Sequence, residues 1–272
     1  DDFADLANAS PWFDQVKIDH KPKVREITKW LSLRKWIRSA GFTRIYDLQT
    51  SDRSNFYYKM IKPINKLNPK PEWSGIAPGC SHPHNNLHRD TMHTIERQKE
   101  QLLSAGIDNV PPGDFSWIDT EIKQFGLNNT FALLVPGGAT HRPAKRWPSQ
   151  YYQQLIQYFA SKKIQVVLIG GKEEEPLLNA LATTDPTCVS LAGGTTLFDL
   201  FSIARKSQVA IGNDTGPMHL FGAQGCPSVV LYSYASNPKL CAQRGSKVII
   251  LRRENLTTLS AEDVMKVLGE FQ

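Results

Sequence analysis

Residues 208–225 read Gln-Val-Ala-Ile-Gly-Asn-Asp-Thr-Gly-Pro-Met-His-Leu-Phe-Gly-Ala-Gln-Gly. A β-branched run at 209–211 meets a glycine and an asparagine, and an apolar segment at helical spacing begins a few residues later. This order predicts a buried strand, a tight turn and a helix. Asp214 or Thr215 is the expected N-cap, and Pro217 suits the first turn, where its missing N–H costs nothing.

The amino end of the predicted helix is a natural seat for phosphate, because its first-turn N–H groups lack partners and carry the positive end of the dipole. Gly216 would let a ligand approach the backbone, and the amides near 215–218 would hold it. His219 could reach an oxyanion, although a helix histidine bonded to backbone explains it equally well. Such turns also serve as plain helix caps, so this turn alone does not establish a phosphate site.

A second strand runs into a glycine turn at 133–140, Leu-Leu-Val-Pro-Gly-Gly-Ala-Thr. The basic segment His-Arg-Pro-Ala-Lys-Arg-Trp-Pro follows at 141–148, before a clear helical pattern. Cationic side chains there could close over an anion held at a helix start, whereas a solvated basic loop is the alternative. Two such turns in one parallel sheet are a stronger signal for phosphate than either alone.

The two segments, with Gly-Gly-Lys-Glu-Glu-Glu at 170–175 between them, resemble glycosyltransferase family 9, the ADP-heptose:lipopolysaccharide heptosyltransferases. The likeness runs from about 131 to 251 and is weaker at 47–50 and 93–97. The resemblance implies an α/β GT-B fold of two Rossmann-like domains with parallel sheets. It also implies that heptose passes from ADP-heptose to an inner-core sugar of lipopolysaccharide, with inversion and without a metal or other cofactor.

Composition is that of an ordinary globular protein, with 272 residues, 40% hydrophobic and 21% charged. No apolar run approaches the roughly 20 residues of a membrane span, and no secretory leader opens the chain. The four cysteines show no framework or metal spacing, which favours reduced thiols and a cytoplasmic location. The net charge of +6 points to anionic partners such as a nucleotide, a phosphorylated glycan or an anionic leaflet.

The second half alternates between strand and helix patterns, as a parallel sheet covered on both faces requires. We expect strands at 131–135, 165–169, 188–191, 209–211, 228–231 and 248–251, and helices at 152–160, 176–182, 197–204 and 218–223. Both glycine turns then fall at the carboxyl ends of strands, where ligands of such sheets bind. We place a nucleotide-sugar-binding domain at 129–272 and an acceptor-side domain at 1–128.

The first half is less regular. We expect strands at 16–18, 44–48 and near 74–77, helices at 23–40, 54–61 and 91–104, loop over most of 62–87, and a passage between domains at 106–130. The chain opens with a short helix, whereas in the resembled family this domain begins with a strand and a Gly-Asp turn whose acidic residue is the proposed base. Nothing here matches that turn. We therefore expect the sequence to begin inside the first domain, without its first strand and without the base.

Glycosyl transfer needs the diphosphate leaving group to be stabilised while the reactants are held in line. Lys145 and the amides near 215–218 are the candidates for that stabilisation, and the resemblance adds Asp214, at the donor sugar or ordering the turn. Glu173 and Glu174 suit ribose hydroxyls, or merely a helix dipole. The resemblance puts adenine at 195–197. The predicted donor-binding set is Thr140, Lys145, Glu173, Glu174, Thr195, Leu197, Asp214, Thr215, Gly216, Pro217, Met218 and His219.

On the acceptor side, Gln49, Ser51 and Arg53 follow the 44–48 strand and are expected to line the cleft. Arg53 could pair with a sugar carboxylate or phosphate, although a surface arginine is the commoner outcome. The nearby group Cys80, His82, His84, His88 and His93 matches no standard zinc spacing, so we expect no metal.

The 23–40 helix carries six basic residues together with Trp30 and Trp36. This composition suits peripheral contact with the inner face of the inner membrane. A solvated helix with buried tryptophans explains the same pattern and is slightly favoured.

Three other functional classes are alternatives to a heptosyltransferase. A GT-B transferase using another nucleotide sugar shares the same features, and a non-catalytic module that binds polyanions or nucleotides would share the basic surface. A dinucleotide oxidoreductase would need Gly-x-Gly-x-x-Gly after a strand, and the chain has none. No nucleic-acid partner is expected.

Overall fold

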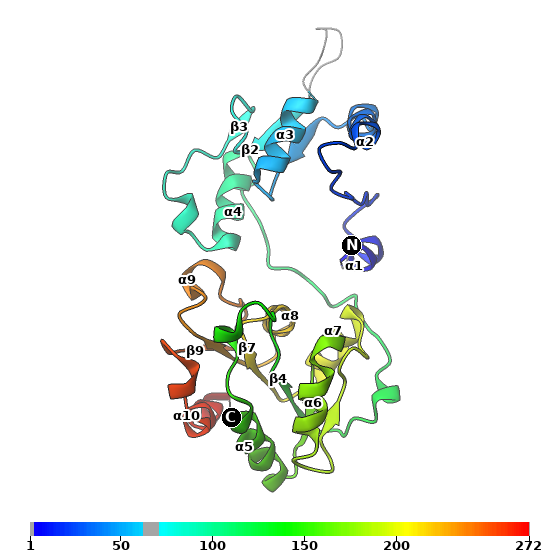
Figure 1. Cartoon of the computed structure of the whole chain (residues 1–272). Helices are drawn as coiled ribbons and strands as arrows, with labels where there is room; N and C mark the ends of the chain where they lie inside the picture. The colour runs from blue at the N-terminus through cyan, green and yellow to red at the C-terminus, as the bar shows by residue number, and fades with distance from the viewer. Residues whose placement is uncertain (1–2, 62–70, 272) are drawn as a thin grey trace. The chain divides into compact units, whose positions relative to one another are not determined.

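The computed structural model describes residues 3–61 and 71–271. The chain divides into two compact units, Asp1–Pro112 (unit 1) and Gly113–Gln272 (unit 2) (Figure 1). This division lies earlier than the expected one after residue 128, because the segment that follows Pro112 packs on unit 2. The ring of Phe115 stacks on Phe201 at 4.6 Å, and Arg205 Nη2 donates to the carbonyl of Ile118 at 2.8 Å.

Unit 2 is built on six parallel strands in the order β6-β5-β4-β7-β8-β9. They are β4 (Phe131–Val135), β5 (Gln165–Leu168), β6 (Val189–Ser190), β7 (Val209–Asn213), β8 (Ser228–Tyr232) and β9 (Val248–Arg252). Each lies close to its predicted bounds. The strand order reverses between β4 and β7, which pair directly, and this switch point is where ligands of doubly wound sheets bind.

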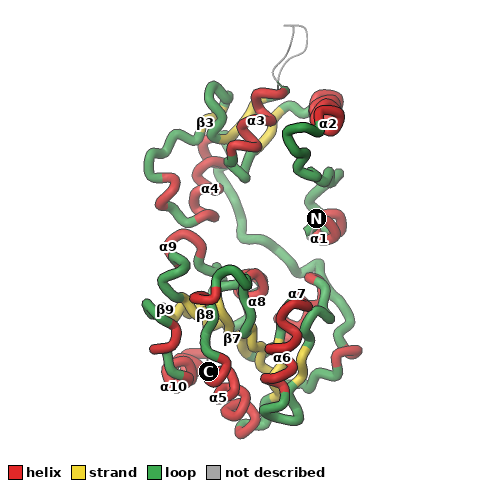
Figure 2. Tube along the Cα trace, in the orientation of Figure 1, coloured by secondary structure: helices red, strands yellow, loops and turns green. Residues whose placement is uncertain are grey.

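Helices connect these strands, and Figure 2 shows the alternation along unit 2. The four predicted helices are present as α5 (Ser149–Ser161), α6 (Glu175–Ala182), α7 (Leu197–Lys206) and α8 (Gly216–Ala223). The structure adds α9 (Pro238–Cys241), α10 (Ala261–Leu268) and the 3₁₀ turns η2 (Lys123–Phe125), η3 (Pro143–Lys145), η4 (Lys172–Glu174), η5 (Leu256–Thr258) and η6 (Gly269–Phe271).

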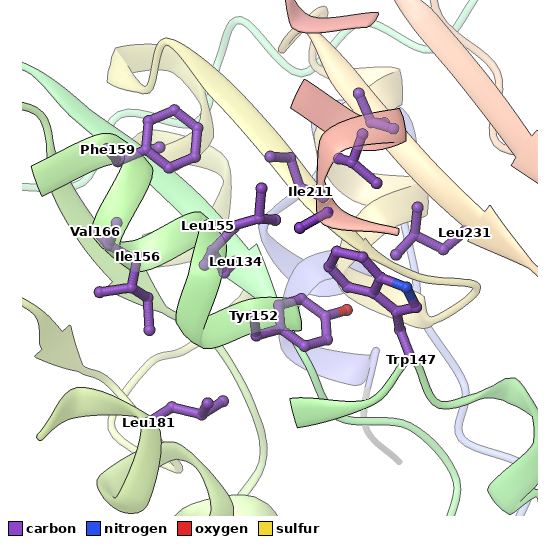
Figure 3. Close-up of a cluster of buried hydrophobic side chains, with 14 of the residues drawn as sticks. Leu134, Trp147, Tyr152, Leu155, Ile156, Phe159, Val166, Leu181, Ile211 and Leu231 are labelled. Atoms are coloured by element: carbon purple, nitrogen blue, oxygen red, sulfur yellow. The ribbon is translucent and has the colours of Figure 1, made fainter. Parts of the chain in front are cut away.

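Hydrophobic cores lie on both faces of this sheet, because successive strand residues point to opposite sides. Leu134 packs with Tyr152 of α5 and residues of α6 and α10, whereas Leu133 packs with Ile203 of α7 and Phe221 of α8. Figure 3 shows the first of these cores. Burial on both faces explains why β4 reads as a continuous apolar run instead of an alternating one.

The described part of unit 1, residues 3–61 and 71–112, contains three short parallel strands in the order β1-β2-β3. Its elements are α1 (Ala4–Ala9), α2 (Ile27–Ser39), β1 (Arg44–Tyr46), α3 (Asp52–Met60), β2 (Glu72–Gly75), β3 (His82–Pro83), η1 (Arg89–Thr91) and α4 (Thr94–Ser104). The core cluster is small, formed by Tyr58, Ile61, Trp73, Ala77 and Cys80.

Several expectations for unit 1 were wrong. Residues 16–18 form no strand, and the segment instead ends in Asp19, whose carboxylate accepts a hydrogen bond from Tyr57. Strand β3 was missed because two residues give no periodicity. Part of the expected 62–87 loop, residues 62–70, lies outside the described residues.

The tryptophans of α2 are not buried, which corrects the interpretation favoured from the sequence. Trp30 and Trp36 are half-buried, and α2 has no buried residue at all, because it packs through one edge only. The Trp30 ring contacts Phe56 at 5.0 Å between centroids, while Ile27 and Leu31 on the same helix are 65% and 57% exposed. Within the described ranges, no helix has the length and apolar character to cross a bilayer.

Candidate functional site

A pocket of about 750 Å³ lies at the carboxyl ends of β4 and β7, and both glycine turns line it. Eight of the predicted donor-binding residues contribute to its wall: Thr140, Lys145, Glu173, Glu174, Asp214, Thr215, Gly216 and Pro217. The turns meet here because their strands are neighbours in the sheet, with Val135 paired to Gly212. The cation and the helix start that the sequence suggested therefore share one cavity.

Lys145 and Asp214 form an ion pair in this pocket. Lys145 Nζ lies 2.6 Å from Asp214 Oδ2, and the two side chains are only 13% and 6% exposed. The lysine comes from η3, which begins at Pro143, and the aspartate directly follows β7. Charge pairs with so little exposure are screened weakly by solvent, so the contact fixes the ammonium group at the pocket wall.

Asp214 receives three further hydrogen bonds. Ser236 Oγ lies 2.6 Å from Oδ2, while Tyr232 Oη and Gln243 Nε2 lie 2.9 Å and 3.0 Å from Oδ1. Burial by itself raises the pKa of Asp214, but the bonds from Lys145, Ser236 and the two Oδ1 donors outweigh it, and the pKa is lowered. The carboxylate is therefore held in its charged form.

Tyr232 completes this arrangement from β8. Burial and the adjacent Asp214 carboxylate raise the pKa of its phenol, so the hydroxyl stays protonated and can donate. Its oxygen also lies 3.2 Å from the carbonyl of Cys241 and 2.9 Å from Gln243 Oε1. Because a phenol has a single proton, these acceptors compete with Asp214 for it.

Asn213 ties the two glycine turns together and was not singled out from the sequence. Its side chain is fully buried, and Nδ2 donates to the carbonyls of Pro136 and Gly137 at 2.8 Å and 2.9 Å. Its Oδ1 accepts from the backbone N–H of Trp147 at 3.0 Å. The sequence does carry one signal for this role: an asparagine ends a buried strand and directly precedes Asp-Thr-Gly.

Glu174 has a bridging role beyond the one predicted. Oε1 accepts from the N–H of Gly138 at 2.5 Å and Oε2 from the N–H of Gly171 at 2.8 Å, which joins the turns after β4 and β5. A side chain at Gly137 would overlap this carboxylate, so the glycine is required for close approach. Glu173 is exposed on the pocket wall and is the carboxylate better placed for a ligand.

The start of α8 differs from the expected cap. Thr215 occupies the N-cap position, but its side chain makes no capping bond, and its Oγ1 donates to the carbonyl of Asn213 at 3.2 Å. Thr215 is therefore the N-cap residue, one of the two predicted, although its side chain gives no capping bond. Asp214 is held instead by Lys145 and its three other donors. The first turn, with Pro217 in it, faces the pocket and brings the positive end of the helix dipole there.

Four predicted donor-binding residues do not line the pocket. The Met218 side chain is fully buried in the core under α8, which leaves only its backbone amide for a ligand. His219 is half-exposed, with Nε2 3.8 Å from Asp214 Oδ1. Thr195 and Leu197 flank Thr196, which caps α7 in a capping box with Asp199. Two unassigned cations, Arg142 and Lys172, do line the pocket.

In unit 1, the three predicted acceptor-side residues Gln49, Ser51 and Arg53 line one pocket of about 570 Å³. Ser51 also caps α3, accepting from the N–H of Ser54. The Arg53 side chain contacts two aromatic residues. Its guanidinium lies 5.5 Å from the Trp30 ring centroid, and Nη1 lies 3.4 Å from Tyr57 Oη.

The cysteine–histidine group has other partners. His82 Nε2 and His84 Nε2 each lie 3.3 Å from a glutamate, Glu72 and Glu100, and His93 accepts from the N–H of Ile95 at the start of α4. Across residues 3–61 and 71–271, no three His, Cys, Asp or Glu side chains come together as metal ligands.

The chain is similar to a known protein family and to several known proteins. A family model described as glycosyltransferase family 9 (heptosyltransferase) matches residues 30–268. Lipopolysaccharide heptosyltransferase 2 of Escherichia coli (strain K12) is 32% identical over 167 residues, 59% of this chain and 47% of that protein. Lipooligosaccharide heptosyltransferase 2 of Haemophilus influenzae is 31% identical over 120 residues, 42% of this chain and 34% of that protein.

The solved structures include a glycosyl transferase family 9 protein from Veillonella parvula DSM 2008. It matches with a TM-score of 0.76 at 21% identity, over 94% of this chain and 81% of that chain. This likeness, with the parallel sheet in each unit, confirms the expected α/β GT-B fold class. The chain spans only about a third to a half of the two curated relatives. Because the family model covers most of the sequence, the chain belongs to glycosyltransferase family 9.

Proposed function

We propose that this protein transfers heptose from ADP-heptose to an inner-core sugar of lipopolysaccharide. The observation that carries the proposal is the pocket at the switch point, where Lys145 and the first turn of α8 face the same cavity. The names of the curated relatives support the sugar and the acceptor. Unit 2 would bind the donor and unit 1 the acceptor.

The pocket wall presents the Lys145 ammonium group and the start of α8 to a diphosphate leaving group, and Arg142 and Lys172 also line it. We assign that group to Lys145 and the amides around Gly216 and Met218, because developing negative charge is stabilised best by donors fixed in advance. Losing one such donor typically raises a barrier by about 3–4 kcal/mol. We propose a metal-independent direct displacement in which an acceptor hydroxyl attacks the anomeric carbon and ADP leaves, with inversion. The hydroxyl proton passes to solvent, since no base is assigned among the described residues.

The remaining residues take supporting roles in this proposal. Asp214 orders Lys145 and the turn, Thr140 contacts the sugar, and Glu173 receives ribose hydroxyls. The turn that holds Thr195 and Leu197 would contact adenine mainly through its backbone. His219, near Asp214, would lie close to the phosphates. In unit 1, Gln49, Ser51 and Arg53 would contact the acceptor, and Arg53 supplies a charge for its acidic groups.

Peripheral attachment to the inner face of the inner membrane is part of the proposal, with the enzyme acting from the cytoplasm. It rests on an apolar groove in unit 1 that includes Val24, Ile27, Leu31 and Phe56, which are 91%, 65%, 57% and 48% exposed. Lys23, Arg34 and Arg53 line the same groove, and further basic residues lie on or just before α2: Arg25, Lys29, Lys35 and Arg38. Anionic lipid headgroups match that charge, and apolar side chains can enter the interface.

Titration calorimetry with purified protein tests the donor assignment. ADP-heptose should bind more tightly than other ADP-sugars and than UDP- or GDP-sugars, and chelation of divalent ions should not weaken binding. Release of ADP in the presence of delipidated inner-core oligosaccharide then tests transfer. Preference for a different nucleotide sugar would favour another GT-B transferase, and equal, strongly salt-dependent binding of any polyanion would favour a non-catalytic module.

A further inference from the structure

Ser236 and Lys145 donate to the same carboxylate oxygen of Asp214. Ser236 Oγ and Lys145 Nζ each lie 2.6 Å from Oδ2, whereas Tyr232 Oη and Gln243 Nε2 donate to Oδ1 at 2.9 Å and 3.0 Å. The Asp214 side chain is only 6% exposed, so water has little access to either oxygen. When the ammonium group moves toward a ligand, the Ser236 hydroxyl is the donor that stays on Oδ2.

The loop that follows β8 carries Ser236 to this position. Within the loop, the N–H of Ser236 donates to the carbonyl of Ser233 at 3.4 Å, and the side chain of Asn237 caps α9. Further along, the carbonyl of Cys241 lies 3.2 Å from the hydroxyl of Tyr232, the residue that ends β8. The loop is thus anchored on both sides of Ser236, which holds the serine hydroxyl in place.

A diphosphate that approaches Lys145 competes with Asp214 for the ammonium group. Without a second donor on Oδ2, the movement of that group would leave a buried, charged oxygen unpaired, which costs more free energy than leaving a neutral acceptor unpaired. The carboxylate would then hold the ammonium group more tightly, and the ligand would receive less of its charge. The Ser236 hydroxyl lowers this cost, because it keeps donating to Oδ2 while the ammonium group turns.

We propose that Ser236 is a positioning residue, which acts through Asp214 and allows Lys145 to direct its charge to the diphosphate of the donor. This inference rests on the proposed function, because it requires Lys145 to meet that diphosphate. Ser236 does not line the pocket, so its effect on the ligand passes through the other two side chains. The effect on binding should therefore depend on the presence of Lys145.

The test is a double-mutant cycle on ADP affinity, measured by calorimetry with the whole chain. Ser236→Ala should weaken ADP binding about tenfold in the wild-type background, as expected when a hydrogen bond to a charged group is lost. In the Lys145→Ala background, the same change should alter ADP affinity by less than about twofold. Ser236→Thr keeps the hydroxyl and should bind ADP as the wild type does. Ser161→Ala, at the exposed end of α5, is the matched control and should also bind normally.

The cycle separates a positioning role from a purely structural one. A loss of affinity that is confined to the background with Lys145 supports the inference. An equal loss in both backgrounds, or no loss in either, overturns it, while the proposed function stands. If Ser236→Ala lacks the wild-type unfolding transition, Ser236→Cys, whose thiol is a weak donor, takes its place in the cycle. A wild-type chain that binds no ADP overturns the proposed function itself and this inference with it.

Discussion

The ammonium group of Lys145 lies 2.6 Å from the carboxylate of Asp214, a residue that three other side chains also hold. An anion entering the pocket must therefore compete with Asp214 for this cation. Asp214 keeps its bonds from Ser236, Tyr232 and Gln243 if the ammonium group turns toward a diphosphate, so its charge remains compensated. Asp214 therefore positions the ammonium group of Lys145 but does not prevent it from contacting a diphosphate.

Replacing Lys145 by alanine should weaken ADP binding about tenfold and slow heptose transfer by about 10²–10³-fold, because the charge that meets the leaving group is lost. Calorimetry with ADP and a coupled assay of ADP release measure the two effects. Lys206→Ala, at the exposed end of α7, is the matched control and should change neither. Undiminished ADP affinity in the Lys145 variant would remove this residue from the proposed mechanism.

The lowered pKa of Asp214 predicts how the free energy of unfolding changes at low pH. The folded pKa lies below the ordinary value of 3.8, so the stabilisation is complete above that value and is lost as the pH falls through the folded pKa. Urea unfolding measured from pH 5 downward should therefore show a shallower acid decline for Asp214→Asn than for the wild type. The exposed Asp108→Asn variant should follow the wild-type curve. Parallel curves for all three proteins would contradict the pKa direction.

Asn213→Ala should destabilise unit 2 by about 3 kcal/mol or more. The change leaves the carbonyls of Pro136 and Gly137 and the N–H of Trp147 without their partner, and each buried polar group left unpaired costs about 1–3 kcal/mol. Urea unfolding followed by tryptophan fluorescence measures the loss. Asn179→Ala, at an exposed position of α6, should stay within about 0.5 kcal/mol of the wild type. An equally small change in the free energy of unfolding for Asn213→Ala would show that the two glycine turns keep their conformation without this side chain.

We predict that Glu174 has a structural role and that Glu173 contacts the ligand. Glu174→Ala removes the acceptor of two backbone N–H groups and should lower stability by about 2 kcal/mol. Glu173→Ala should leave stability within about 0.5 kcal/mol and weaken ADP binding, but not the binding of inorganic diphosphate, which has no ribose. Thermal unfolding and calorimetry on both variants provide the comparison. If Glu173→Ala lowers stability and Glu174→Ala weakens only ADP binding, the two role assignments are wrong.

The sequence predicted the sheet of unit 2 well, because strands buried on both faces are continuous apolar runs such as 131–135. It also predicted that Lys145 and the 214–217 turn meet, since adjacent parallel strands bring their carboxyl ends together. The side-chain network could not be read in the same way. Which donors reach Asp214 depends on the path of the 233–243 loop, and local patterns carry no signal for contacts between distant segments.

Unit 1 was harder to predict for a related reason. Its strands have two to four residues, too few for any periodicity to be distinct. Residues 16–18 include two β-branched side chains, but they form no strand. A strand needs a neighbouring strand to pair with, and the segment's own sequence does not show whether the fold provides one. The tryptophans of α2 follow helical spacing, but spacing does not reveal whether anything covers that face.

The exposed apolar face of α2 gives the last prediction. The variant Ile27→Glu with Leu31→Glu should lose binding to vesicles that contain phosphatidylglycerol, because it places charge where the face would enter the interface. Wild-type binding should weaken with added salt and be much lower on phosphatidylcholine alone, since each basic residue near an anionic surface contributes about 1 kcal/mol. Leu87→Glu is the matched control, as Leu87 is 96% exposed but lies outside the groove. Co-sedimentation measures all of these. Equal vesicle binding by the double variant and the control would assign membrane contact to another surface or exclude it.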